Sequence, residues 1–369
     1  MATAEGASIP IIDSHIHLFP EAELDTLAWY TPGGPLSKQH SLEEYAAATG
    51  SPANLQGFVF LETDRKNADS SDWTHPLQEI AWLRRIATGE PREGEGHAPA
   101  DAKLCLGIVP WAPVVLGTAK LEEYLQQAET TAGPAWDKVR GFRYLVQDKP
   151  NGTMLKDEFI AGLQLLGRKG LVFDLGVDQH KRGRIQLEEA VEMIDRAHED
   201  VEEDDKVVFI LSEFSLSWPL ARACVCVCVC KLTGMRIDHI CKADLSIINT
   251  TDPAFIAWRT AMFTLSKCTK TYMKLSGCLS EMPGSIKNQS AEEIFAAIFP
   301  WLAVVLAAFG PSRIMFGSDW PVCTVGVNDG AWEKWRKVVA RMCDMASLTL
   351  EEQEMIWSGT ARKAYNLDE

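Results

Sequence analysis

The sequence predicts an α/β fold, specifically a single (β/α)8 TIM barrel, and three observations support this prediction. Eight short apolar segments alternate with helical segments along the chain. At the end of the first predicted strand the sequence reads Asp-Ser-His-Ile-His. An open doubly wound sheet would usually have a glycine-rich phosphate loop there. The length of 369 residues also suits one barrel.

The elements follow from hydrophobic patterning along the chain. Apolar, β-branched runs predict strands at residues 11–19, 57–63, 104–111, 139–146, 170–177, 207–211 together with 237–240, 271–278 and 313–318. Helical periodicity predicts helices at residues 77–86, 121–130, 157–169, 187–200, 253–267, 291–309, 331–345 and 350–365. The polar stretches 31–41 and 88–101 are predicted surface loops. One barrel domain would cover residues 11–369, after a tail of residues 1–10.

Composition excludes several classes of function. Lys and Arg number 36 against 51 Asp and Glu, so the formal net charge is −15, which argues against nucleic acid and anionic membranes as partners. Ten cysteines in a chain of this length do not indicate a secreted disulfide scaffold. Residues 1–10 lack the features of a secretion signal, and residues 291–309 are better explained as a core helix than as a membrane span. We expect a cytoplasmic protein with a small-molecule substrate. The sequence leaves its oligomeric state open.

His15 and His17 stand at the end of the first predicted strand. Residues two apart on a strand point to the same face, so both imidazoles are expected to enter one space. Metal ligands or acid/base groups would be placed in this way. The alternative is two polar residues at a strand end without a shared function.

Two further residues follow other predicted strands. His239 ends the sixth strand and Asp319 ends the eighth. The carboxyl ends of barrel strands converge on one mouth, where active sites form. His15, His17, His239 and Asp319 are therefore expected to meet there. The set suits one metal ion with an open coordination position, or a metal-free acid/base site.

Four more residues are candidates for substrate binding. Arg143, near the end of strand four, suits a donor to a substrate oxygen, or else a structural ion pair. Glu62 ends strand two and could bind substrate hydroxyls or orient a histidine. His180 follows strand five, either as a site residue or as a loop histidine. Trp320 could form a wall for a substrate ring, which the family resemblance given next implies is a sugar, or pack in the core.

Five segments carry a family resemblance: IIDSHIHLF (11–19), VRGFRYLVQ (139–147), DHICKADL (238–245), TYMKLSGCLSE (271–281) and RIMFGSDWP (313–321). In this order they resemble the amidohydrolase superfamily, in its amidohydrolase-related branch, which includes sugar-lactone and pyrone-dicarboxylate lactonases. The resemblance runs from about residue 11 to about residue 366. The segments GFRYLVQ, FDLGV and GSDWPV look most like lactonases acting on fuconolactone- or rhamnonolactone-like substrates.

The resemblance implies a hydrolase that opens a lactone of a sugar acid by attack of water at the barrel mouth. It matches His15, His17 and His239 to the family's histidines, and Asp319 to the general base. Strand four lacks the bridging lysine or glutamate of two-metal relatives. The resemblance therefore implies one divalent ion, Zn or Mn, or a metal-free mechanism. The alternatives are an amide hydrolase or a non-oxidative decarboxylase of the same superfamily, or an inactive barrel.

Residues 212–236 interrupt the predicted sixth strand. Cysteine and valine alternate from Cys224 to Cys230, as a translated TG repeat would read, and removing the segment would join 207–211 directly to 237–240. We interpret the segment as an aberrant insertion, such as a retained intron, with a genuine insertion as the alternative. It is expected to lie outside the barrel, with His239 still near the mouth.

Overall fold

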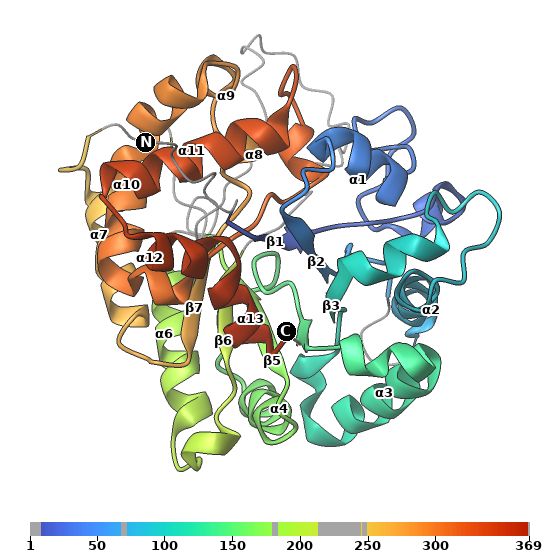
Figure 1. Ribbon diagram of the computed structural model, residues 1–369. Coiled ribbons are helices and arrows are strands. Elements are labelled where there is room, and N and C mark those ends of the chain that lie inside the picture. The colour runs from blue at the N-terminus through green and yellow to red at the C-terminus, as the bar shows by residue number, and fades with distance from the viewer. Residues whose placement is uncertain (1–8, 68–71, 179–183, 213–244, 246–248, 368–369) are drawn as a thin grey trace, which may run out of the picture.

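Eight parallel strands form a ring inside a layer of helices (Figure 1). The structure is a computed structural model and describes residues 9–67, 72–178, 184–212, 245 and 249–367. In the described part, the strands are β1 (Ile11–Ile16), β2 (Leu55–Leu61), β3 (Cys105–Val109), β4 (Gly141–Arg143), β5 (Val172–Gly176), β6 (Phe209–Ser212), β7 (Thr271–Leu275) and β8 (Ile314–Phe316).

Continuous ladders join the strands in two groups, β1–β2–β3 and β4–β5–β6–β7–β8. Backbone contacts connect the groups at both seams. Between β3 and β4, the Arg140 amide donates to the Ile108 carbonyl at 3.0 Å. Between β8 and β1, the His17 amide donates to the Trp320 carbonyl at 2.7 Å. Parallel bridges accompany both contacts, so the ring closes as the predicted barrel.

The helices surround the strands and fall between them in sequence. In the described part they are α1 (Leu42–Thr49), α2 (Thr74–Thr88), α3 (Gly117–Ala132), α4 (Asp157–Arg168), α6 (Arg184–His198), α7 (Pro253–Leu265), α8 (Cys278–Glu281), α9 (Gly284–Lys287), α10 (Ala291–Phe309), α11 (Ala331–Met345), α12 (Leu350–Glu354) and α13 (Thr360–Tyr365). By length and composition, α10 alone among the described helices could cross a membrane, and here it packs beside α7 and α11.

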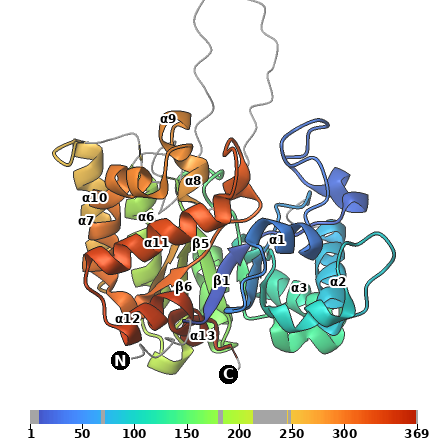
Figure 2. The ribbon, with the colours of Figure 1, turned by 45° about the horizontal axis from the view of Figure 1, so that its top comes forward.

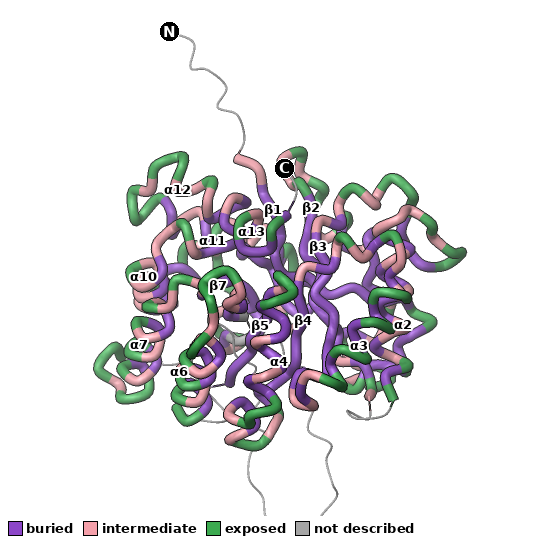
Figure 3. The backbone as a smooth tube through the Cα atoms, turned by 90° about the horizontal axis from the view of Figure 1, so that it is seen from below, coloured by how far each residue is buried: buried purple, intermediate pink, exposed green. Residues whose placement is uncertain are grey.

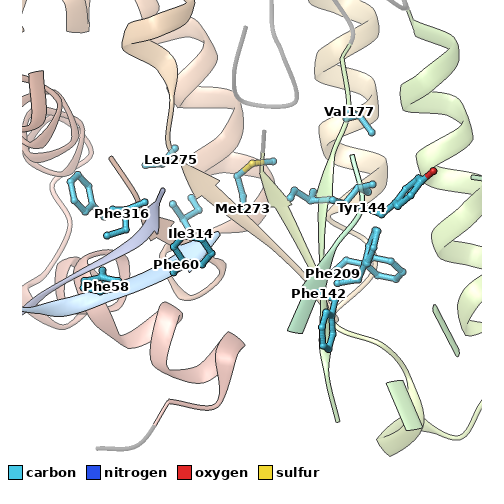
Figure 4. Close-up of a cluster of buried hydrophobic side chains, with 14 of the residues drawn as sticks. Phe58, Phe60, Phe142, Tyr144, Val177, Phe209, Met273, Leu275, Ile314 and Phe316 are labelled. Atoms are coloured by element: carbon cyan, nitrogen blue, oxygen red, sulfur yellow. The ribbon is translucent and has the colours of Figure 1, made fainter. Parts of the chain in front are cut away.

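Side chains on the outer faces of the strands form the main core, between the barrel and the helices (Figure 4). Phe159, Phe173 and Phe209 illustrate it, because the Phe173 ring of β5 packs edge to face against Phe159 of α4 and Phe209 of β6. Viewed from below, buried strands occupy the centre and exposed loops the rim (Figure 3).

The lower part of the barrel interior is a second apolar cluster, here called the floor. It consists of inward side chains from seven strands together with the last helix: Ile12, Val59, Leu61, Val109, Val172, Ile210, Tyr272, Met315, Ala361, Ala364, Tyr365 and Leu367. The last helix, α13, therefore closes the end of the barrel opposite α8 and α9 (Figure 2).

The sixth strand differs from the prediction. The described residues form β6 from Phe209 to Ser212 alone, and this short strand pairs with both β5 and β7. Ser212 belongs to the strand, since it pairs with Gly176, and is not the first residue outside it. The rest of the proposed insertion, residues 213–236, lies outside the described residues, as does the expected half-strand 237–240. Helix α1 was not predicted at all.

Candidate active site

His15, His17 and Asp319 meet at the carboxyl end of the barrel, where β1 adjoins β8. The two Nε2 atoms are 3.1 Å apart, and Asp319 Oδ1 lies 3.4 Å from His15 Nε2 and 3.3 Å from His17 Nε2. All three side chains are buried. The predicted convergence of strand ends is therefore found for these three residues, although they are separated by about 300 positions in the sequence.

A change of register in β1 turns both histidines inward. Ile12 faces the barrel floor, whereas Asp13 faces outward and accepts hydrogen bonds from Tyr45 and Trp332, both at 2.9 Å. The pairing of β1 with β2 shifts between Asp13 and Ile16. In a regular strand, alternate residues face the same side, so Ile12 and His15 could not both point inward. The irregularity allows Ile12, His15 and His17 all to face the barrel interior.

Neighbouring groups fix the orientation of each imidazole. The Nδ1–H of His17 donates to the carbonyl oxygens of Leu61 at 3.0 Å and Glu62 at 2.9 Å. Carbonyl oxygens only accept, so the proton resides on Nδ1 and Nε2 presents a lone pair to Asp319. His15 Nδ1 lies 3.1 Å from the hydroxyl of Ser276. Burial, followed by the charge of Arg143, holds the pKa of His17 well below its usual value, so this imidazole is neutral.

Asp319 is positioned by the close approach of β8 to β1. Its amide donates to the His15 carbonyl at 2.8 Å, and the preceding Ser318 amide donates to Asp13 Oδ1 at 2.7 Å. Gly317 permits this approach, because a Cβ there would lie 2.8 Å from the Cβ of His15. Asp319 itself has a left-handed backbone (φ 61°), a conformation that aspartate adopts more readily than most residues.

The three donor atoms fit one metal ion. Atoms that share a tetrahedral zinc ion at about 2.0–2.1 Å lie about 3.3–3.4 Å from one another, close to the separations found here. A histidine ligand usually donates its second ring nitrogen to a carbonyl group, as His17 does. Among the described residues, His15, His17 and Asp319 form the one group of three or more such side chains close enough to hold an ion together.

A layer of buried charges lies within the barrel beside these residues. Arg143 Nε is 3.8 Å from Glu62 Oε1 and 3.9 Å from Asp174 Oδ1. Lys274 Nζ is 2.7 Å from Asp174 Oδ2, and the hydroxyl of Tyr365 donates to the same oxygen at 3.1 Å. We call these five side chains the charged layer. All of them are at most 1% exposed.

Burial dominates the pKa values in the charged layer. It raises the pKa of Glu62 to about 8, a change that Arg143 opposes and Asp64 and Glu79 reinforce. It lowers the pKa of Lys274 to about 8, against the attraction of Asp174. Each ionised group is therefore stabilised by its partners and destabilised by the loss of water.

The other predicted residues are found in different settings. Trp320 is 2% exposed and packs edge to face against Tyr45 and His40, as in the core-packing alternative, and its role as a wall for a sugar ring stays a prediction. Glu62 orients His17, through its backbone carbonyl. Arg143 reaches the site as a buried member of ion pairs. His239 and His180 lie outside the described residues.

Sequence reasoning missed several residues that build the site. Lys274 and Ser276 stand at alternate positions at the end of β7. The same spacing at a strand end identifies His15 and His17. Asp174 is a charge inside an apolar strand, which also marks an unusual environment. No local pattern identifies Tyr365, because its partner Asp174 is 191 residues away.

Comparison with known proteins agrees with this architecture. A sequence model of the amidohydrolase family matches residues 12–367. The chain is 29% identical over 367 residues to an L-rhamnono-gamma-lactonase of Scheffersomyces stipitis, covering 97% of this chain and 98% of that protein. It is 26% identical over 300 residues to an L-fucono-1,5-lactonase of Burkholderia multivorans, covering 81% and 86%.

The fold also matches a solved structure. The crystal structure of a Burkholderia multivorans amidohydrolase with bound zinc superposes with a TM-score of 0.68 and 23% identity, covering 97% of this chain and all of that one. The family match extends over nearly the whole barrel. This chain belongs to the amidohydrolase family.

Proposed function

We propose that this protein hydrolyses a lactone of a sugar acid at the mouth of its barrel. The observation that carries the proposal is the buried cluster of His15, His17 and Asp319, with the charged layer beside it. The names of the two lactonases that resemble the chain over most of its length support the substrate class. The acidic net charge is consistent with a small-molecule substrate, and a cytoplasmic location stays a prediction.

Asp319 is the general base in this proposal. Its carboxylate takes a proton from a water molecule as the water oxygen attacks the lactone carbonyl. The ring C–O bond then breaks, and Asp319 returns the proton to the leaving ring oxygen, which gives a hydroxy acid and restores the base. Arg143 is assigned to the substrate side, where its guanidinium donates to a hydroxyl or to the oxyanion that forms during attack. His239 is assigned to the same mouth on the resemblance alone.

His15, His17 and Asp319 would hold the metal ion, which we propose is a single Zn or Mn. Such an ion supplies Lewis acidity, which polarises a carbonyl and lowers the pKa of water towards about 7. Without an ion, His15 and Arg143 would donate to the developing oxyanion, which is the metal-free alternative, because the single ring proton of His17 is held by the carbonyl oxygens of Leu61 and Glu62. Either way, the backbone carbonyls of Leu61 and Glu62 keep the His17 ring in place.

A proton-release screen tests the proposed function. The purified protein is offered a panel of aldonolactones, an amide panel and an aromatic carboxylate panel, and metal content is measured on the same sample. We expect acid release from γ- or δ-lactones of deoxy sugar acids, above the spontaneous rate. Turnover of amides alone, or carbon dioxide release alone, would assign the chain to a different reaction of the family. No turnover of any panel by folded protein would favour the inactive barrel.

A further inference from the structure

The charged layer is unusual because it brings four ionisable side chains together inside the barrel. Glu62 and Asp174 supply two carboxyl groups, and Arg143 and Lys274 supply two basic groups. They enter from β4, β5, β7 and the end of β2, and Tyr365 reaches them from α13 below. On β7, Lys274 lies one inward step below Ser276, the partner of His15.

Stability alone does not account for this arrangement. Replacing a buried group of paired charges by well-packed apolar residues is often neutral or stabilising, because ionised groups lose hydration when buried. One inward step lower, the same strands carry apolar or weakly polar side chains, including Val172 on β5 and Tyr272 on β7. The charged layer therefore occupies positions that a barrel can fill with hydrocarbon, directly beneath the cluster of His15, His17 and Asp319.

A series of contacts through Asp174 links Tyr365 on α13 to Arg143 on β4. Lys274 and Tyr365 both donate to Oδ2 of Asp174, while Oδ1 of the same carboxylate faces Arg143 Nε at 3.9 Å. The Lys274 ammonium also lies 5.4 Å above the centre of the Tyr365 ring. Since 3.9 Å is too long for a hydrogen bond, Asp174 acts on Arg143 through its charge, and the place of that charge is set by the two donors.

We propose that Lys274 and Tyr365 are positioning residues for the reaction, which fix the Asp174 carboxylate so that Asp174 and Glu62 hold the Arg143 guanidinium in its working orientation. The role of Arg143 rests on the proposed lactone hydrolysis. The structural part of the proposal does not depend on that reaction: the Tyr365 hydroxyl, in the barrel floor, helps to fix the orientation of the Arg143 side chain near the mouth.

The first test compares two Tyr→Phe substitutions. Tyr365→Phe removes one hydrogen bond to a carboxylate and is expected to lower kcat/KM by about tenfold. Tyr272→Phe is the matched control, because Tyr272 belongs to the same floor cluster but, among the described residues, its hydroxyl forms no hydrogen bond with the charged layer. It should leave kcat/KM within about twofold. Equal effects of the two substitutions would overturn the proposal.

The second test asks whether the effect passes through Asp174. In an Asp174→Asn background, Tyr365→Phe and Lys274→Met should cause little further loss, because both act on the group already changed. Lys274→Arg keeps the cation and should retain more activity than Lys274→Met. Full additivity of Tyr365→Phe with Asp174→Asn would show that Tyr365 acts by another route and would overturn the proposal. Tyr365→Phe keeps this test usable if Lys274→Met does not fold.

A readout without substrate separates this proposal from the proposed function. The Nε–H of Arg143, assigned by its loss in Arg143→Lys, is followed by nuclear magnetic resonance. Tyr365→Phe and Lys274→Arg should shift this resonance or speed its exchange with solvent, and Tyr272→Phe should not. An unchanged resonance in both would contradict the positioning role even if lactones are hydrolysed. A shifted resonance in a protein that hydrolyses no lactone would contradict the proposed function alone.

Discussion

The floor and the charged layer are two levels of one barrel interior, built from the same strands with opposite chemistry. On β5, Val172 faces the apolar floor, and two residues later Asp174 faces the charged layer. On β7, Tyr272 and Lys274 show the same change. The side chains of both levels are buried, so exposure to solvent does not distinguish the two levels.

The difference indicates that the floor and the charged layer have different roles, the first in stability and the second in the orientation of polar side chains. Apolar burial in the floor contributes to stability at about 25 cal/mol per Å² of buried area. Paired charges in the upper level add little net stability but fix the orientation of polar groups. We therefore expect substitutions of floor residues other than Tyr365, whose hydroxyl reaches the charged layer, to change the free energy of unfolding. Substitutions in the charged layer should change the rate of hydrolysis.

The largest expected effect comes from the two histidines. His15→Ala combined with His17→Ala removes two of three donors and should reduce hydrolysis to the spontaneous rate. If a metal is required, chelation of the wild-type protein should produce the same loss, and adding Zn²⁺ or Mn²⁺ should reverse it. Activity is measured by proton release and metal by elemental analysis. Full activity of metal-free protein would assign oxyanion stabilisation to His15 and Arg143.

A somewhat smaller loss is expected at Arg143. Arg143→Lys keeps the charge but loses the planar guanidinium, so kcat/KM should fall roughly 10²-fold. Arg140→Lys, immediately before the same strand, is the control and should change kcat/KM little. If the two variants were equally active, Arg143 would be a structural ion-pair residue.

The floor should respond in the opposite way. Ile210→Ala creates a cavity in the floor and should lower the free energy of unfolding by about 2–5 kcal/mol, as measured by urea denaturation. At a temperature where the variant remains folded, its kcat should stay close to that of the wild type. A large loss of kcat with unchanged stability would show that the two levels are not separate in function.

The smallest expected effect concerns pH. Glu62 has a pKa of about 8 in the folded protein, against about 4.3 in an unfolded chain. The folded state therefore binds more protons between these values, so this contribution to stability is present at low pH and is lost as pH rises through about 8. Glu62→Gln should flatten this dependence. Urea denaturation at about pH 5.5 and about pH 8.5 tests it, with exposed Glu122→Gln as the control.

Much of the fold could be predicted from local patterns. Helices α10 and α11 have the predicted bounds, and every predicted strand has a counterpart among the described residues. All the strands except β2 are shorter than predicted, as at β4, because apolar residues continue after the chain has left the ladder. Helix α1 was missed although Ser41 and Glu44 form a capping box, because the polar residues before it were interpreted as loop.

The site could be predicted only where chemistry and spacing coincide. His15 and His17 share a strand end, and Asp319 ends another strand, so barrel geometry brings them together. Arg143 and Glu62 of the charged layer were predicted as site residues, but Lys274 and Asp174 escaped prediction because they resemble the solvent-facing residues of an amphipathic strand. In a closed barrel that face is the interior. The contact between Tyr365 and Asp174 depends on the packing of α13 against the floor, and no local sequence pattern predicts that packing.

Replacement of Asp319 by asparagine tests the central claim most directly. Asp319→Asn preserves shape but cannot take a proton from water, so kcat for the preferred lactone should fall roughly 10²–10⁴-fold. The thermal unfolding midpoint should change little, since the residue lies at the mouth and not in the apolar floor. A variant that stays folded and turns over the same lactone at a rate close to the wild type would contradict the assignment of this site.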